Sequence, residues 1–326
     1  MKKTMKRALS ILLASTMAFG AMGCSKKQEQ VVIYSNADDE AVDAMKKALD
    51  ENGYKDKYIF QTFGTSELGG KILAEGNNLE ADMITMSSYY IDSAQSQNQM
   101  FLDLTFDHKT LGEYPSYYTP ITAQEGAIIV NTELIKSENL PMPACIKDLA
   151  DPVYEGMISV TDISSSSTAW LLIQAVISAN GEEEGKQVLS QIFKNAGPHI
   201  ESSGSGPIKK VRAGEVAVGF RLRHQAAADK ASGLPIDFID PQEGNFSLTE
   251  SVAVIDKKDK TNPLAMEMAQ CIIQKGRTDL LKTYPLPVYE GETADDSAKS
   301  AYPKVFPEPL TVDLLKKHTD FSNSCK

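Results

Sequence analysis

The sequence contains few of the residues on which disulfide frameworks, metal sites and histidine-based catalysis depend. Its 326 residues include four cysteines and four histidines, with no CxxC pair and no HExxH motif. This composition indicates neither a disulfide-stapled fold nor a zinc site, and we expect no cofactor. Apart from Cys24, the cysteines are Cys145, Cys271 and Cys325; one bridge among these three is the alternative, but we expect unpaired thiols.

The motifs of common nucleotide-binding and acyl-transfer enzymes are also missing. A Walker loop needs four residues between its first glycine and a Gly-Lys pair, followed by Ser or Thr. Here five residues separate Gly64 from Gly70-Lys71, and isoleucine follows. Ser205 has Ser203 rather than glycine two positions before it, so it does not form a nucleophile elbow. We therefore do not expect an enzyme.

The chain has fewer basic than acidic residues. The chain has 33 Lys and Arg residues against 44 Asp and Glu residues, for a net charge of -11. Four of the positive charges lie in the first seven residues, so loss of an N-terminal signal would change the net charge from -11 to -15. A protein this acidic is a poor candidate for binding nucleic acid or anionic lipid head groups.

The N-terminal apolar run is shorter than the ~20 residues that a membrane helix needs. It covers 8–23, follows the positively charged segment Met1–Arg7 and ends before Cys24 and the polar SKKQEQ, which is the order typical of an export signal. The residues before Cys24 resemble a bacterial lipobox, with Met22 where a small residue is usual.

This pattern predicts that 1–23 is a signal peptide, that Cys24 carries lipid and that 24–30 is a linker to the membrane surface. We therefore expect an exported protein at the cell surface or in the periplasm. An uncleaved signal anchor with an incidental cysteine is the alternative.

Two series of alternating strands and helices follow the N-terminal segment. Such alternation indicates parallel sheets, and about 300 mature residues exceed what one core usually serves, so we expect an α/β fold with two lobes. The first series predicts strands at 31–36, 58–63 and 82–86 and helices at 38–52 and 66–76. The second predicts strands at 157–160, 199–202, 216–220 and 235–240 and helices at 168–180, 207–215 and 223–232.

Two further segments, 123–131 and 248–255, are apolar at their ends and polar in the middle, and we interpret them as strands that cross between the lobes. The chain would start in lobe one, cross to lobe two and return to finish lobe one with helices near its C-terminus. The predicted divisions are lobe one at 31–122 and 253–326, and lobe two with the crossing strands at 123–252.

Runs of small hydroxyl residues follow several of these strands, where the next helix begins. In open α/β sheets ligands bind at the carboxyl ends of the strands, and helix starts present unpaired N–H groups there. Hydroxyls at such positions favour a bound anion. A serine that only caps its helix is the alternative for any one segment. The residues concerned are Thr65, Ser66, Ser87, Ser88, Ser164, Ser165, Ser166, Ser167, Thr168, Ser203 and Ser205.

Two arginines, Arg221 and Arg223, follow the strand 216–220. An arginine fork can bind a phosphoryl or carboxylate group bidentately. Alternation in extended structure would place both side chains on the same side, so either could be such a clamp. A solvated surface pair is the alternative.

Several segments of the sequence resemble a known protein family. The lipobox, the opening VVIYSNAD, the segment GTSELGGKILAEG, the crossing strand QEGAIIVNTEL and the serine-rich start of lobe two resemble solute-binding proteins of ABC importers. Within these they resemble the type 2 group that includes binders of ferric ion, thiamine, phosphorylated sugars and 2-aminoethylphosphonate. The resemblance implies two lobes that close on a small solute by rotation about 124–127 and 250–253, and a closed form that docks on a membrane permease. We expect a monomer.

The resemblance also implies site residues. Lobe one would contribute Ser35, Asn36 and the hydroxyls of its helix starts, and lobe two would contribute its serines and one arginine. If the solute carries an ammonium group, Asp38 or Glu250 would meet it. Ferric binders of the group place two adjacent tyrosines where this chain has Arg221-Leu222-Arg223, which favours an anion such as a phosphonate or phosphate ester. A ferric-ion importer subunit and a lipoprotein enzyme acting on phosphate esters are the alternatives.

Overall fold

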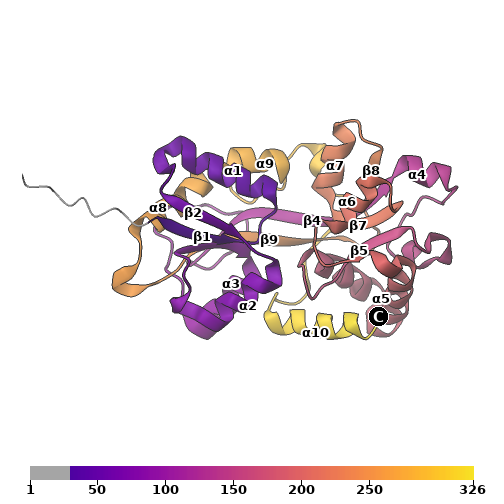
Figure 1. Cartoon of the computed structure of the whole chain (residues 1–326), viewed down its shortest axis with the longest axis horizontal. Coiled ribbons are helices and arrows are strands. Elements are labelled where there is room, and N and C mark those ends of the chain that lie inside the picture. Colours follow the sequence, from indigo (N-terminus) through magenta and orange to yellow (C-terminus); the bar gives the residue numbers. More distant parts are fainter. Residues whose placement is uncertain (1–29) are drawn as a thin grey trace, which may run out of the picture.

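The computed structural model describes residues 30–326, so the predicted signal peptide 1–23, Cys24 and all but the last residue of the linker 24–30 lie outside the described part. Figure 1 shows two α/β halves side by side, with long strands running through the middle. Between residues 30 and 326, no helix is long and apolar enough to cross a membrane.

The half that contains the first described residues, here called lobe one, has the strand order β2-β1-β3-β9-β4. Its first three strands are parallel and alternate with helices, which lie on both faces of the sheet (Figure 1). These elements are β1 (Val31–Ser35), α1 (Asp39–Leu49), β2 (Tyr58–Thr62), α2 (Thr65–Glu75), β3 (Met83–Ser87) and α3 (Ser88–Asn98).

Strands β4 (Thr119–Asn131) and β9 (Asn245–Val254) join the two halves, and the two segments predicted to cross lie in them. The first part of β4 pairs antiparallel with β9, and β9 pairs antiparallel with β3. From Gly126 onward β4 pairs instead with β7. A Cβ at Gly126 would lie 2.6 Å from the Phe220 ring, so this close approach requires glycine.

The second half, here called lobe two, has the strand order β4-β7-β5-β6, with β8 on the other edge of β4. Its strands are β5 (Ile158–Thr161), β6 (Ile200–Glu201), β7 (Val218–Leu222) and β8 (Ile236–Ile239). Its helices are α4 (Thr132–Ser137), α5 (Thr168–Ala196), α6 (Gly206–Ala213) and α7 (Arg223–Ala231). Helix α5 is longer than predicted because the chain resumes the helix after a break at Gly181, where φ is 70°.

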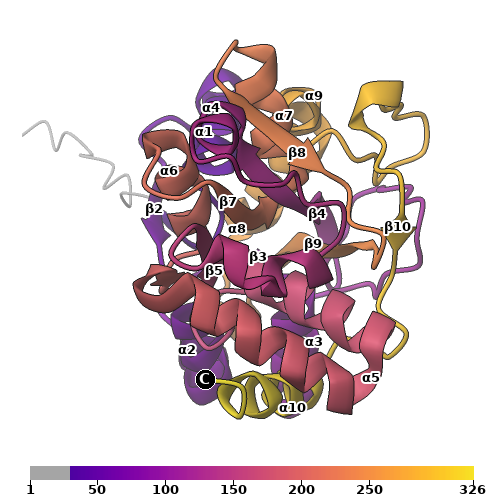
Figure 2. The same ribbon diagram turned by 90° about the vertical axis from the view of Figure 1, so that its right-hand side faces the viewer.

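The C-terminal segment departs from its expected place. Helices α8 (Pro263–Cys271) and α9 (Arg277–Thr283) pack on α1 in lobe one, and the short strand β10 (Pro303–Lys304) pairs with β9. Helix α10 (Val312–Asn323), which the sequence assigns to lobe one, instead lies along α5 of lobe two and also contacts α3 (Figure 2).

The contact between α10 and α5 includes a buried polar pair. Trp170 Nε1 donates to His318 Nδ1 at 2.7 Å. The Trp170 ring also packs edge-on against Tyr89 of α3 and Phe306, with ring centroids 5.0 and 5.2 Å away. The largest hydrophobic cluster is therefore continuous between the lobes on this side of the molecule.

The three cysteines within the described residues carry free thiols, so no bridge forms among Cys145, Cys271 and Cys325.

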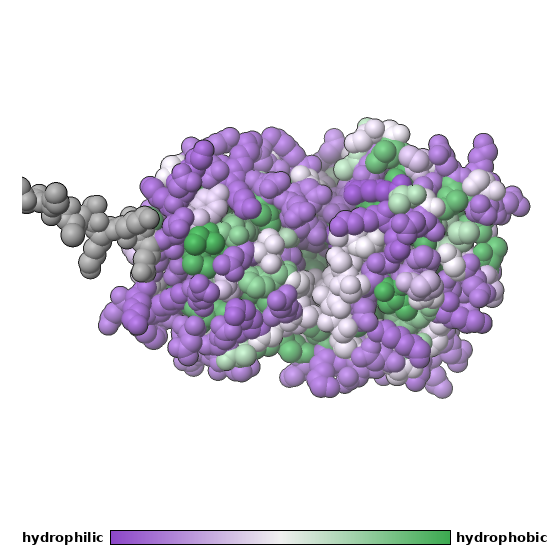
Figure 3. Space-filling view, viewed as in Figure 1, coloured by the Kyte–Doolittle hydropathy of each residue, from purple (hydrophilic) through white to green (hydrophobic). Residues whose placement is uncertain are grey.

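The surface of both lobes is mostly hydrophilic, and it is hollowed between them (Figure 3). The α/β fold with two lobes is thus the fold that the sequence predicts.

Candidate functional site

A cleft of about 460 Å³ lies between the lobes. Four helices begin at its walls, α1 and α2 from lobe one and α5 and α6 from lobe two. The crossing strands contribute Gln124 of β4 and Glu250 of β9 to the lining. This is the end of the sheets at which open α/β folds bind ligands.

None of these four helices has a side-chain cap. The side chains of the N-cap residues Asp38, Ser167 and Ser205 accept no bond from the first turn of their own helix, and the N-cap of α2 is Gly64, which has no side chain. Among the helices whose N-cap residues do not line the cleft, α4, α8 and α10 are capped by an N-cap side chain, whereas α3, α7 and α9 are not. No N-cap side chain therefore covers the starts of the four cleft helices, although some of their first N–H groups bond to nearby carbonyls and the Thr168 N–H bonds to Ser166 Oγ. Helix starts of this kind favour an anion.

The hydroxyl residues of lobe two gather at the starts of α5 and α6. They pack closely on Gly204, where a Cβ would lie 2.6 Å from Ser166 Oγ and 3.0 Å from Thr168 Oγ1. Ser166 Oγ accepts a long 3.4 Å bond from the Thr168 N–H. The hydroxyl residues that line the cleft here are Ser165, Ser166, Ser167, Thr168, Ser203 and Ser205. Ser164 lies outside the lining, because its N–H and Oγ both donate to Asp162.

Arg221 is the buried cation of the cleft, with 2% of its surface exposed. Its Nη2 donates to Asp38 of lobe one at 2.6 Å, Nη1 to Thr168 Oγ1 at 2.7 Å and Nε to Gln225 Oε1 at 2.8 Å. A guanidinium has five N–H donors, so two remain for a ligand once these three are occupied. The Asp38 carboxylate, at the start of α1, thus bonds across the cleft instead of capping its own helix.

Arg223 does not share this position, so the prediction that both arginines face the same side is wrong. Strand β7 ends at Leu222 and Arg223 is the first residue of α7, so the side chains no longer alternate at 180° per residue. Arg223 donates through Nε and Nη2 to Asp240, and through Nη1 and Nη2 to the carbonyls of residues 297–299. All five of its donors are occupied, which leaves none for a ligand.

Lobe one lines the cleft with Asn36, Thr65 and Glu250. In the amide orientation that satisfies its neighbours, Asn36 donates to Glu250 Oε2 at 2.7 Å and accepts from Thr65 Oγ1 at 2.9 Å. Ser87 Oγ donates to Glu250 Oε1 at 2.8 Å. Burial raises the pKa of Glu250 to about 8 despite these two donors, so the carboxyl is mostly protonated at neutral pH.

The other predicted lobe-one residues lie beneath or beside the cleft and do not line it. Ser35 Oγ accepts from Thr85 Oγ1 at 2.7 Å, and Ser88 Oγ bonds to the Ser251 hydroxyl at 2.8 Å. The first bond joins β1 to β3 and the second joins α3 to β9, while Ser87 orients Glu250. The residues outside the lining are Ser35, Ser66, Ser87 and Ser88.

Several polar residues that the sequence analysis did not select also line the cleft: Asp39, Glu40, Thr62, Glu67, Gln124, Ser202, Lys209, Arg212 and Gln225. Gln124 is one of the polar residues in the middle of a crossing strand, which was an available signal. Lys209 and Arg212 lie three residues apart on α6, a spacing that places both on one helix face. Gln225 has no such signal, because its position depends on the bond with Arg221.

Charge is divided between the two walls. Lobe one presents carboxylates, and lobe two presents hydroxyls together with cationic side chains. Within the described residues no tyrosine lines this cleft, and no three His, Cys, Asp or Glu side chains are arranged to hold a metal ion. The acidic lining residues are Asp38, Asp39, Glu40, Glu67 and Glu250, and the basic ones are Lys209, Arg212 and Arg221.

Comparisons with known proteins agree with this geometry. Residues 82–306 match the family model described as bacterial extracellular solute-binding protein. An uncharacterized protein of Haemophilus influenzae is 26% identical over 245 residues, which cover 72% of this chain and 69% of that protein.

Solved structures of periplasmic binding proteins have the same fold. The periplasmic binding protein P5PA has a TM-score of 0.75 at 17% identity, covering 91% of this chain and 100% of that one. AfuA from Actinobacillus pleuropneumoniae, with exogenous fructose-6-phosphate bound, has a TM-score of 0.69 at 22% identity, covering 91% and 94%. Because the family model matches well over half of the chain, this protein belongs to the bacterial extracellular solute-binding family, whose type 2 periplasmic-binding members are substrate-binding subunits of ABC importers.

Proposed function

We propose that the cleft captures a small anionic solute, a phosphonate such as 2-aminoethylphosphonate or a phosphate ester, and delivers it to a membrane permease. One observation carries the proposal: four uncapped helix starts and the Arg221 guanidinium, with two unoccupied N–H donors, meet at one cleft. Backbone N–H groups, hydroxyls and an arginine fork together match the oxygen atoms of a phosphonyl or phosphoryl group.

The opposite wall favours a solute that also carries positive charge. Asp38, Asp39 and Glu40 lie at the start of α1, facing the hydroxyl wall of lobe two. An anion alone would bring negative charge toward these carboxylates, whereas an aminoalkyl phosphonate would place its ammonium group there. The division of charge therefore favours a zwitterion over a simple anion.

Capture would proceed by rotation of the lobes about β4 and β9. In the structure the bond between Asp38 and Arg221 joins the lobes across the cleft. The entering phosphonate would take the place of the Asp38 carboxylate on Arg221, and Asp38 would then turn to the ammonium group. Lipid on Cys24 would keep the protein near its permease, and Cys24→Ser should move it from the membrane fraction to the soluble fraction.

A thermal-shift screen of the mature protein tests the proposal, because a solute that binds only the folded state raises stability by RT ln(1 + [L]/Kd), about 4 kcal/mol at a thousandfold excess over Kd. The compounds are 2-aminoethylphosphonate, methylphosphonate, inorganic phosphate, fructose 6-phosphate, putrescine, thiamine and ferric citrate. We expect the largest shift with 2-aminoethylphosphonate. A shift with ferric citrate alone, accompanied by visible colour, would support an iron carrier instead.

Two single variants, compared with each other, test whether the anion binds at Arg221. Arg221→Lys keeps the buried charge but loses the fork, and we expect it to weaken binding of the best compound at least tenfold, since each charge-assisted bond contributes roughly 1.5–3 kcal/mol. Arg212→Lys is the matched control on the same wall, because Arg212 is an exposed residue that pairs with Asp229. Equal losses in both variants would contradict the assigned role of Arg221.

A further inference from the structure

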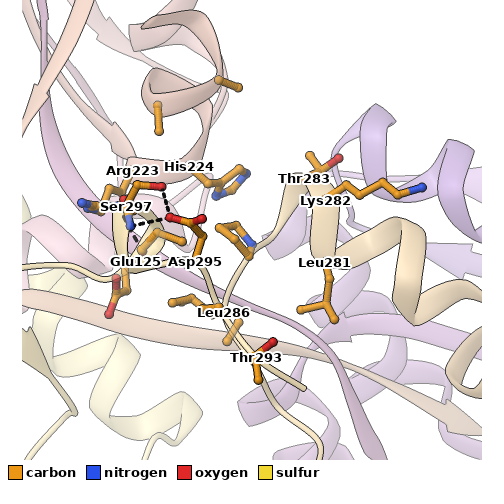
Figure 4. A pocket seen from close by; sticks show the side chains of 16 residues that line it. Glu125, Arg223, His224, Leu281, Lys282, Thr283, Leu286, Thr293, Asp295 and Ser297 are labelled. Atoms are coloured by element: carbon orange, nitrogen blue, oxygen red, sulfur yellow. Dashed lines mark hydrogen bonds between the residues drawn. The ribbon is translucent and has the colours of Figure 1, made fainter. Parts of the chain in front are cut away.

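A second cavity, of about 310 Å³, lies on the other face of strand β4 (Figure 4). Gln124 lines the interlobe cleft, whereas its neighbours Ala123 and Glu125 line this second cavity. Successive residues of a strand point to opposite faces, so the crossing strand itself separates the two cavities. We call the second cavity the rear pocket.

The rear pocket also lies between the lobes. One wall is the start of α7 in lobe two, with His224 and Ala227, and the opposite wall is the end of α9 and the loop after it, with Leu281 and Leu286. Figure 4 shows Arg223, His224 and Glu125 on one side and Leu281 and Thr283 on the other. A third segment, 293–298, closes the remaining side.

Two buried polar side chains at this pocket keep bonding capacity that their neighbours do not use, although the Ser300 hydroxyl and the Arg223 guanidinium both act to lower the pKa of Glu125. Glu125 is 7% exposed and forms no ion pair within residues 30–326. His224 is 8% exposed, and its Nε2 atom has no hydrogen-bond partner. Burial raises the pKa of Glu125 to about 6 and lowers that of His224 to about 3, so the wall presents one carboxylate and one neutral imidazole at pH 8. A buried polar atom without a partner, such as His224 Nε2, is rare in folded proteins and calls for an explanation.

The charges around the pocket define the kind of ligand that would satisfy Glu125. Both cations of the lining are already engaged, Arg223 with Asp240 and Lys282 with Asp279. The Asp295 carboxylate accepts only from Ser297. In the described part of the chain neither carboxylate forms an ion pair, although Arg223 attracts Glu125 and Lys299 attracts Asp295. The rest of the lining is largely alanine, leucine and proline.

We propose that the rear pocket binds a small organic amine, with its ammonium group on Glu125 and a short apolar body against Leu281 and Leu286. A carboxylate that is nine-tenths buried, forms no ion pair and lies beside apolar side chains matches such a molecule in charge and in shape. The site is separate from the proposed solute site, because β4 lies between them.

Titration of the mature protein with n-butylamine at pH 8 tests this site, with n-butanol and butyrate as matched probes of the same length. We expect saturable binding of the amine, at least tenfold weaker binding of the alcohol and no binding of butyrate. Saturating inorganic phosphate should not displace the amine, which distinguishes a failure of this site from a failure of the proposed solute site.

Glu125→Gln keeps the shape of the side chain and removes its charge, and we expect it to weaken amine binding at least tenfold. Glu113→Gln, which removes the charge of an exposed glutamate that lines neither cavity, is the matched control and should leave amine binding unchanged. If Glu125→Gln does not fold, Ala227→Leu, which fills the pocket, serves in its place. Absence of saturable amine binding, equal binding of butanol, or equal losses in the two glutamate variants would each overturn the proposal.

Discussion

The substitution Asp38→Asn tests directly whether the protein's own carboxylate occupies the position of the anion. Asp38 Oδ2 lies 2.6 Å from Arg221 Nη2, and the two side chains are 28% and 2% exposed. In the proposed exchange an incoming phosphonate displaces this carboxylate, so binding is opposed by the loss of one charge-assisted hydrogen bond, worth roughly 1.5–3 kcal/mol. Removing the charge should therefore increase the affinity for methylphosphonate by about tenfold or more, since 1.4 kcal/mol corresponds to a factor of ten.

Asp39→Asn supplies the matched control. Asp39 lies next to Asp38 at the start of α1 and also lines the cleft, but it forms no bond with Arg221. Both variants lose one negative charge at the same helix start, so a general relief of repulsion should appear equally in both. Only a gain specific to Asp38→Asn reports displacement from Arg221.

A second ligand makes the result sharper. With 2-aminoethylphosphonate, Asp38→Asn also removes the proposed partner of the ammonium group, so we expect its gain to be smaller than that for methylphosphonate. Titration calorimetry of the three proteins with the two ligands measures all six affinities. An unchanged or lower affinity of Asp38→Asn for methylphosphonate would refute the reasoning, and an equal gain in Asp39→Asn would assign the effect to net charge.

Three further substitutions test other parts of the structure. Replacing Ser165 and Ser166 together by Ala should reduce solute affinity at least tenfold in calorimetry with little change in melting temperature, and unchanged affinity with a lower melting temperature would show that the run only supports the helix. Glu250 has a folded-state pKa raised to about 8, so the folded protein binds more protons than the unfolded chain between about pH 4.5 and pH 8, and its stability falls as pH rises through this window. Glu250→Gln should flatten that fall, and parallel melting curves for parent and variant from pH 5 to pH 8 would contradict the assignment. Gly126→Ala places a Cβ 2.6 Å from Phe220 and should cost about 1–3 kcal/mol in denaturant unfolding, whereas a neutral result would mean that β4 shifts freely at this point.

The strands and helices of this protein were largely predictable because each is set by local pattern. The buried strand Val31–Ser35 is almost wholly apolar, and α1 has apolar residues at helical spacing on one face, so periodicity alone identifies both. The length of α5 was not predictable in this way. A glycine at residue 181 ends a helical pattern in sequence, but here it introduces a break after which the helix continues.

The candidate site was predictable in outline, because hydroxyl runs at strand ends mark the carboxyl edge of a sheet. Which of these residues face the cleft depends on long-range contacts that no local pattern specifies. Ser87 and Ser88 follow a strand just as Ser166 and Thr168 do. Their hydroxyls nevertheless bond to residues of β9, a strand about 160 positions later in the chain, and do not line the cleft. The two arginines differ for a related reason, since one residue of difference places Arg221 on a strand and Arg223 on a helix.

The uncapped helix starts connect the stability of the protein to its proposed activity. A side-chain cap stabilises a helix by about 1 kcal/mol, so four helices without caps forgo roughly 4 kcal/mol that serine or aspartate at the same positions could supply. Two of the four N-cap residues are serines and one is aspartate, so the residue types needed for capping are present but their side chains do not make the bond. At Asp38 the reason is visible, because its carboxylate bonds to Arg221 in the opposite lobe. A ligand that supplies oxygen atoms to these N–H groups would act as a shared cap for helices of both lobes, so its binding would stabilise the closed arrangement and each lobe at the same time.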